Sequence, residues 1–125
     1  MSRTNLLHVE DDASAAYALA RTLEDEDVDI THAFNADQAR RALRAGGFGL
    51  MIVDVMLPPR VDREGLDLCL ELRRTHPGLP LLIFTNRQDD GLLDEIKAHG
   101  IAWLDKGADD EALLARVREL LGGGP

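Results

Sequence analysis

Acidic, hydroxyl and amine side chains follow four short apolar segments of this sequence, each close to the segment's end. In chain order they are Glu10, Asp11, Asp12, Asp54, Thr85, Asp105 and Lys106. If the apolar segments are parallel strands of one sheet, their carboxyl ends meet at one edge, where such sheets bind ligands. Two carboxylates about 4 Å apart repel by about 4 kcal/mol at an effective dielectric of ~20. The pattern therefore predicts a site that needs a cation.

The oxygen-rich character of these side chains indicates which cation and which reaction the site would support. Carboxylates suit Mg²⁺, and no soft ligand lies nearby to favour zinc. We expect Glu10, Asp11 and Asp54 to gather around that ion. Beside Mg²⁺, the carboxylate of Asp54 can act as a nucleophile toward phosphorus and form an acyl phosphate. Lys106 would neutralise charge on the phosphoryl oxygens, and the Thr85 hydroxyl would donate to one of them.

Short apolar segments alternate with longer segments of helical period, which is typical of βα units around a parallel sheet. The expected strands are Leu6–Val9, Val28–Ala33, Phe48–Val53, Leu79–Phe84 and Ile101–Leu104. The segments Leu50–Val53 and Leu81–Phe84 are continuously apolar, as expected of strands covered on both faces. Val28–Thr31 alternates apolar and polar residues, which indicates an edge strand. The sequence predicts an α/β fold.

The helices between these strands have recognisable ends. Asn35 and Gln38 form a capping box at the start of one helix, and Gly46 ends it. Gly100 ends another helix. The last helix begins with the acidic residues 109–111, which suit the positive end of the helix dipole, and ends at the glycines 122–124.

Composition limits the classes of protein that this chain can be. Its 125 residues are enough for one domain with a buried core. The formal charge of -9 repels phosphate backbones and anionic membranes, so we expect no direct nucleic-acid partner and no membrane partner. No apolar run approaches the roughly 20 residues that span a bilayer. The first residues do not resemble a signal peptide, so we expect a cytoplasmic protein.

The histidines and the single cysteine do not indicate a metal site. His8, His32, His76 and His99 show no metal-ligand spacing, so we interpret each as a surface or edge residue. Cys69 has no partner for an internal disulfide and lies in an apolar helical segment. We expect it to be a buried structural thiol in a reducing compartment.

Four motifs together resemble the receiver domain of two-component response regulators. They are His8–Asp12, Val53–Pro58, Phe84–Asn86 and Trp103–Lys106, in the family's order and spacing across the whole chain. The resemblance implies a doubly wound, flavodoxin-like fold with five helices and a parallel sheet of strand order 2-1-3-4-5. It also implies that residues 1–125 form a single receiver domain.

The resemblance further implies a role for each site residue. Asp54 accepts the phosphoryl group from a sensor histidine kinase or a phosphotransfer protein. Glu10, Asp11 and the backbone carbonyl of Met56 join Asp54 in holding Mg²⁺, while Thr85 and Lys106 bind the phosphoryl group. Thr85 and Trp103 form the switch that changes the domain's affinity for a downstream protein. The domain could also form a phosphorylation-dependent homodimer, and it would catalyse only its own phosphorylation and dephosphorylation.

The sequence departs from the family's pattern at several positions. Gly107 replaces the proline that usually follows the lysine, so the customary cis peptide bond there is in question. Asn86 replaces a small residue beside the phosphoryl pocket. The loop 59–64 is longer than usual, and Met56 and Arg87 occupy positions that tune dephosphorylation.

Two other functions are consistent with parts of the pattern. A phosphatase of the haloacid dehalogenase type also forms an aspartyl phosphate, but it needs an acid two residues after the nucleophile, where this chain has Met56. A pseudo-receiver that binds partners without phosphorylation would normally have lost Asp54 or Lys106, and both are present. Trp103 fits ordinary packing at the sheet edge as well as a switch role.

Overall fold

The computed structural model describes residues 3–59, 63–86 and 90–123. Its strands are β1 Thr4–Val9, β2 Val28–Ala33, β3 Leu50–Val53, β4 Leu81–Thr85 and β5 Ala102–Asp105. Its α-helices are α1 Ala13–Thr22, α2 Ala36–Ala45, α3 Glu64–Thr75, α4 Asp90–Ala98 and α5 Asp110–Arg118, and a π-helical turn, Glu119–Gly123, follows α5. Strands and helices alternate along the chain, as predicted.

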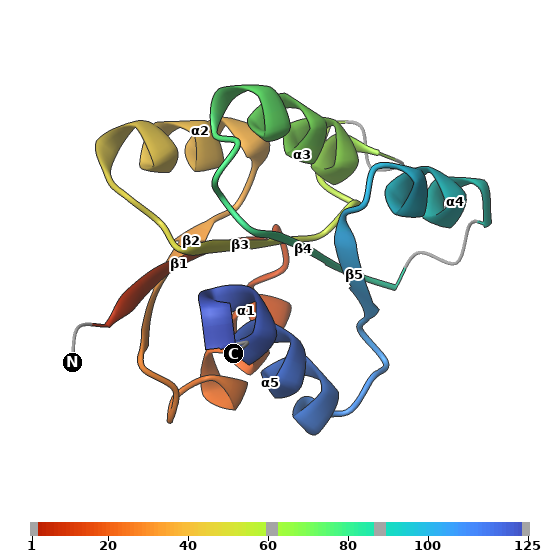
Figure 1. Ribbon diagram of the computed structural model, residues 1–125. Coiled ribbons are helices and arrows are strands. Elements are labelled where there is room, and N and C mark those ends of the chain that lie inside the picture. Colours follow the sequence, from red (N-terminus) through yellow and green to blue (C-terminus); the bar gives the residue numbers. More distant parts are fainter. Residues whose placement is uncertain (1–2, 60–62, 87–89, 124–125) are drawn as a thin grey trace.

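The strands form one parallel sheet in the order β2-β1-β3-β4-β5, which confirms the predicted doubly wound topology. Helices α2, α3 and α4 cover one face of the sheet, and α1 and α5 cover the other (Figure 1). Because consecutive strands are parallel, every strand ends at the same edge of the sheet. The predicted site residues lie at that edge, where the strand order reverses between β1 and β3, and this is where such sheets bind ligands.

Burial follows the position of each strand in the sheet. All four residues of β3 are buried, since helices cover both of its faces. Strand β2 alternates buried and exposed residues and pairs only with β1, which confirms the predicted edge strand. Cys69 of α3 is completely buried, and burial raises the pKa of its thiol to about 12. The predicted structural thiol is therefore confirmed.

The ends of several strands differ from the prediction. Strand β3 begins at Leu50 rather than Phe48, although the backbone N–H of Gly49 still donates to the Asn5 carbonyl of β1 at 2.8 Å. Strand β4 begins at Leu81 rather than Leu79, since Pro80 has no N–H to donate to a neighbouring strand. These differences move no predicted site residue away from the carboxyl edge.

Helix ends agree closely with the sequence. Asn35 Oδ1 accepts from the backbone N–H of Gln38 at 2.8 Å, and Gln38 Oε1 accepts from that of Phe34 at 2.7 Å. Gly46 caps the C-terminus of α2 in an extended conformation, whereas Gly100 adopts the left-handed conformation with φ of 67°. Within the described ranges, none of the helices is long and apolar enough to cross a bilayer.

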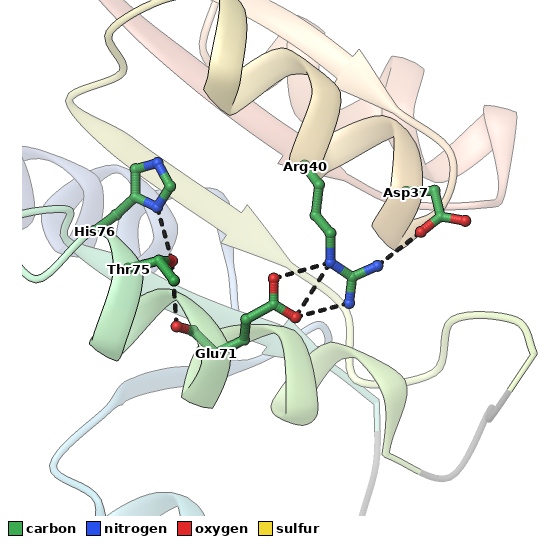
Figure 2. Close-up of polar contacts among 5 residues, drawn as sticks. All are labelled: Asp37, Arg40, Glu71, Thr75 and His76. Atoms are coloured by element: carbon green, nitrogen blue, oxygen red, sulfur yellow. Dashed lines mark hydrogen bonds and ion pairs between the residues drawn. The ribbon is translucent and has the colours of Figure 1, made fainter.

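An arginine joins α2 to α3 on the outer surface of one helical layer (Figure 2). Arg40 Nε donates to both carboxylate oxygens of Glu71, at 3.2 and 2.9 Å, and Arg40 Nη1 donates to Asp37 Oδ1 at 2.7 Å. Since Glu71 belongs to α3 and Asp37 to α2, the guanidinium group fixes the two helices against each other.

Candidate functional site

Asp54 lies directly after β3 and is only 6% exposed. Its Oδ1 accepts from the Thr85 hydroxyl at 2.7 Å and from the backbone N–H of Met56 at 3.0 Å. Its Oδ2 accepts from Lys106 Nζ at 2.8 Å. The three donors come from β4, the loop after β3 and the residue after β5, so the sheet's carboxyl edge assembles the predicted pocket.

Lys106 connects Asp54 to a second buried acid. Its Nζ also donates to Glu10 Oε1 at 2.5 Å, and Glu10 is buried at the end of β1. The other Glu10 oxygen accepts from the backbone N–H of Asp12 at 3.2 Å. Asp11, the third acid predicted here, is exposed. The structure therefore brings Glu10, Asp54, Thr85 and Lys106 together, with Asp11 at the exposed side.

Burial and charge shift the pKa values of this group. Burial raises the pKa of the Glu10 carboxyl, and the hydrogen bond from Lys106 offsets only part of that rise. Burial alone would lower the pKa of Lys106, but the carboxylates of Asp54 and Glu10 outweigh it and the pKa is raised. Lys106 therefore remains a cation whose charge is required by two acids held away from water.

The donors at this edge fit a hard divalent cation. Glu10, Asp11 and Asp54 supply only carboxylate oxygens, and oxygen ligands are those that Mg²⁺ prefers. Across residues 3–59, 63–86 and 90–123, no group of three or more His, Cys, Asp or Glu side chains is arranged to hold a metal ion. Lys106 instead contributes the positive charge between Glu10 and Asp54.

Local features explain how these residues are positioned. Asp12 caps α1 by accepting from the backbone N–H of Ser14 at 2.9 Å. Asp105 Oδ1 accepts from the backbone N–H of Gly107 at 2.6 Å, which stabilises the turn after Lys106. In the described part of the chain the cis peptide bond is Pro58-Pro59, and the bond before Gly107 is trans.

Sequence reasoning missed Gly65, which packs against the backbone of the phosphoacceptor candidate. A Cβ at Gly65 would lie 2.0 Å from the carbonyl oxygen of Asp54 and 2.7 Å from Val55 Cα. Only a glycine lets the first turn of α3 approach Asp54 so closely. A glycine in the first turn of an amphipathic helix was the available signal.

The prediction that His8 is a surface or edge residue is wrong. His8 is 2% exposed, because β1 is a central strand and its side chains alternate between two covered faces. Its ring centroid lies 5.5 Å from that of His32 on β2. Burial, the neighbouring His32 and Lys106 together lower the pKa of His8 to about 3, so the ring is neutral.

Trp103 lies half-buried on β5, beside the strand that carries Thr85. The ammonium group of Lys97 on α4 lies 5.9 Å from the centroid of the Trp103 ring. Thr85 itself is buried and donates to Asp54. Asn86 is exposed, and Arg87 lies outside the described residues.

The topology and the buried acid, hydroxyl and ammonium groups at the sheet's carboxyl edge define a flavodoxin-like α/β domain. The family model described as "Response regulator receiver domain" matches residues 6–118. The chain belongs to this family and is a receiver domain of a two-component response regulator.

Individual relatives agree with this assignment. The uncharacterized transcriptional regulatory protein YkoG of Bacillus subtilis (strain 168) is 33% identical over 129 residues, which cover 97% of this chain and 52% of that protein. The response regulator MprA of Mycobacterium ulcerans (strain Agy99) is 34% identical over 124 residues, which cover 93% and 49%. The chain thus spans about half the length of these curated relatives.

Solved structures show the same architecture. The BeF3-activated N-terminal receiver domain of RstA from Klebsiella pneumoniae superposes with a TM-score of 0.84 at 27% identity, covering 94% of this chain and 97% of that one. The signal receiver domain of an HD domain-containing protein from Pseudomonas fluorescens Pf-5 gives 0.88 at 24% identity, covering 98% and 90%, and supports the fold alone.

Proposed function

We propose that this domain accepts a phosphoryl group on Asp54 in an Mg²⁺-dependent reaction with a sensor histidine kinase or a phosphotransfer protein. The observation that carries the proposal is the environment of Asp54. Its buried carboxylate receives a hydroxyl, an ammonium and a backbone N–H, all within 3.0 Å. A phosphoryl group bound to Asp54 would present its oxygens to the same three donors.

Each residue has a defined task in this proposal. Glu10, Asp11 and Asp54 would hold Mg²⁺ together with the backbone carbonyl of Met56. The ion would supply positive charge that stabilises the transferring phosphoryl oxygens. Lys106 neutralises one of these oxygens.

The transfer itself balances without another reactant. A bond forms between an Asp54 carboxylate oxygen and phosphorus, while the bond from phosphorus to the donor's imidazole nitrogen breaks and its electron pair stays on nitrogen. Hydrolysis of the acyl phosphate later returns the carboxylate. The domain therefore catalyses only its own phosphorylation and dephosphorylation, and it signals by binding.

Thr85 and Trp103 would transmit the effect of phosphorylation to the surface of the domain. On phosphorylation, the Thr85 hydroxyl turns from Asp54 to a phosphoryl oxygen, and Trp103 on the adjacent strand repacks. The surface formed by α4, β5 and α5 then changes its affinity for a downstream protein or for a second copy of the domain. Such a switch needs only a modest difference in free energy between the two arrangements.

The setting of the domain follows from the same proposal. Residues 1–125 act as one receiver domain in the cytoplasm, and the single buried cysteine accords with a reducing compartment. The charge of -9 disfavours contact between this domain and nucleic acid. YkoG is called a transcriptional regulatory protein, but it is about twice as long as this chain.

Acetyl phosphate or beryllofluoride with Mg²⁺ tests the proposal directly. We expect wild type to gain the mass of one phosphoryl group with acetyl phosphate, and Trp103 fluorescence to change with either reagent. Asp54→Asn should show neither change. Asp25→Asn, in the exposed loop after α1, is the matched control and should behave as wild type. An unchanged mass in wild type, or an equal gain in Asp54→Asn, contradicts the assignment.

The pseudo-receiver alternative predicts a different result. A domain that binds partners without phosphorylation would show no Mg²⁺ binding in a titration followed by Trp103 fluorescence. Asp54 and Lys106 are both present and in contact, which favours the phosphoacceptor function.

A further inference from the structure

A cavity of about 190 Å³ lies between α1, α5 and the sheet, beneath the carboxyl edge. Its walls are apolar and come from both helices, including Ala18 and Leu19 of α1 and Leu113 of α5. Its floor includes His8 and Glu10 of the β1 segment. Cavities with apolar walls and a few polar groups are where proteins bind small molecules.

His8 is the buried imidazole among the residues that line the cavity. His8 is only 2% exposed, and its Nδ1, like Nε2 of the neighbouring His32, has no hydrogen-bond partner within the described residues. Buried polar atoms without a partner are rare in folded proteins. A neutral imidazole presents one nitrogen as an acceptor, so a bound molecule with an N–H or O–H group would satisfy His8.

The charges around the cavity indicate the kind of molecule. Buried Glu10 and the exposed Asp110 of α5 both line it. The Thr22 hydroxyl of α1 donates to the Ala18 carbonyl at 3.1 Å and lies 3.4 Å from Asp110 Oδ1. Lys106 also lines the cavity, but its ammonium is already bound to Glu10 and Asp54. The polar lining therefore offers acceptors and anionic charge rather than a free cation.

We propose that this cavity binds a small organic ammonium ion with an apolar body. The body packs among Ala18, Leu19 and Leu113, and the ammonium group donates to His8 and to the carboxylates of Glu10 or Asp110. Such a ligand matches the apolar walls, the acceptor on the floor and the net negative charge of the lining.

Three probes with the same ring and different head groups test the charge preference. Benzylammonium, benzyl alcohol and benzoate are each titrated into the domain labelled for amide NMR, without a phosphoryl donor. We expect benzylammonium to bind with a dissociation constant of about 1 mM, given its small size, and to shift the amides of Leu19 and Leu113. Benzoate should bind about tenfold more weakly or not at all. No binding of benzylammonium, or equal binding of benzoate, overturns the proposal.

Two variants and one control variant locate the site. Ala18→Leu fills the cavity from α1 and should weaken benzylammonium binding about tenfold. Ala45→Leu makes the same change at an exposed position of α2, on the opposite face of the sheet, and should leave binding unchanged. His8→Leu keeps the volume and removes the acceptor, so it should weaken binding without altering the amide spectrum elsewhere. Equal binding to wild type and Ala18→Leu places the probe outside this cavity and overturns the proposal.

An occupant would also affect the neighbouring site. Glu10 and Lys106 contact both the cavity and Asp54's surroundings, so an ammonium ion on Glu10 competes with Lys106 and with Mg²⁺. We expect benzylammonium to slow phosphorylation by acetyl phosphate. This consequence rests on the proposed function, whereas the binding test does not, so the two can fail separately.

Discussion

The two faces of the sheet are built differently, although the same strands supply both. Toward α2, α3 and α4, strand β1 presents Leu7 and Val9, which pack into an apolar cluster. Toward α1 and α5, the β1 segment presents Leu6, then His8, then Glu10, so polarity rises toward the carboxyl edge. On β1, the side chains toward α2, α3 and α4 are apolar, while those toward α1 and α5 include an imidazole and an acid beside the site.

Removing Lys106, which contacts Glu10 on the polar side of β1, should cause the largest loss of stability. In Lys106→Met, Glu10 and Asp54 lose their shared cation, and we expect the free energy of unfolding at pH 7 to fall by about 4 kcal/mol. Urea unfolding measures the change.

The pH dependence of that loss has a definite sign. An acid whose pKa is raised in the folded state binds its proton more tightly there, so its burial lowers stability as pH rises above the unfolded value. Without Lys106, the pKa of Glu10 rises further. The deficit of Lys106→Met should therefore shrink as the pH is lowered to about 5. A deficit that grows on acidification contradicts this account, and Lys97→Met on α4 is the exposed control.

Truncation on the apolar face should cost nearly as much, but without pH dependence. Leu7 is completely buried in the core beneath α2 and α3. We expect Leu7→Ala to lower the free energy of unfolding by about 3 kcal/mol through lost burial and the cavity left behind. Thr31→Ala, at an exposed position of β2, should change it by less than about 0.5 kcal/mol. The difference from wild type should be the same at pH 5 and pH 7.

Substitution of His8, on the face toward α1 and α5, should change stability in a pH-dependent way. A base whose pKa is lowered from 6.5 to about 3 on folding destabilises the protein as pH falls below 6.5, because the unfolded chain takes up the proton first. His8→Leu removes that effect. At pH 5 the variant should be about 2 kcal/mol more stable relative to wild type than it is at pH 7. Parallel pH profiles of the two proteins would show that folding leaves the pKa of His8 unchanged, which contradicts this account.

The arginine between α2 and α3 should give the smallest effect. Its ion pairs with Glu71 and Asp37 are partly exposed, so Arg40→Met should lower stability by about 1 kcal/mol at low salt and by less at high salt. Arg41→Met, on the exposed side of the same helix, is the matched control. If both variants lose the same amount of stability, positive charge on α2, rather than the ion pairs of Arg40, stabilises this layer.

The sequence predicted most of the fold because its signals are local or periodic. Continuous apolar runs identified central strands, and Asn35 with Gln38 identified a helix start. The strand order followed from the family resemblance rather than from the pattern. Asp54 and Lys106 could be placed at one edge because parallel strands end together.

Other features depend on contacts between distant residues. The pairing of Lys106 with Glu10 joins positions 96 residues apart, and no spacing rule reports it. His8 could not be recognised as buried, because one histidine in an apolar strand fits either an edge or a covered position. Gly65 reveals its role only through its closeness to the Asp54 carbonyl.

The thiol of Cys69 can report the separation of α3 from the sheet. As the only cysteine, fully buried in α3 with a thiol that resists ionisation, it is out of reach of an alkylating reagent while the helix stays on the sheet. Labelling therefore proceeds only through molecules in which α3 has separated. The alkylation rate, followed by mass spectrometry on unmodified protein, counts those molecules and gives the free energy of that separation.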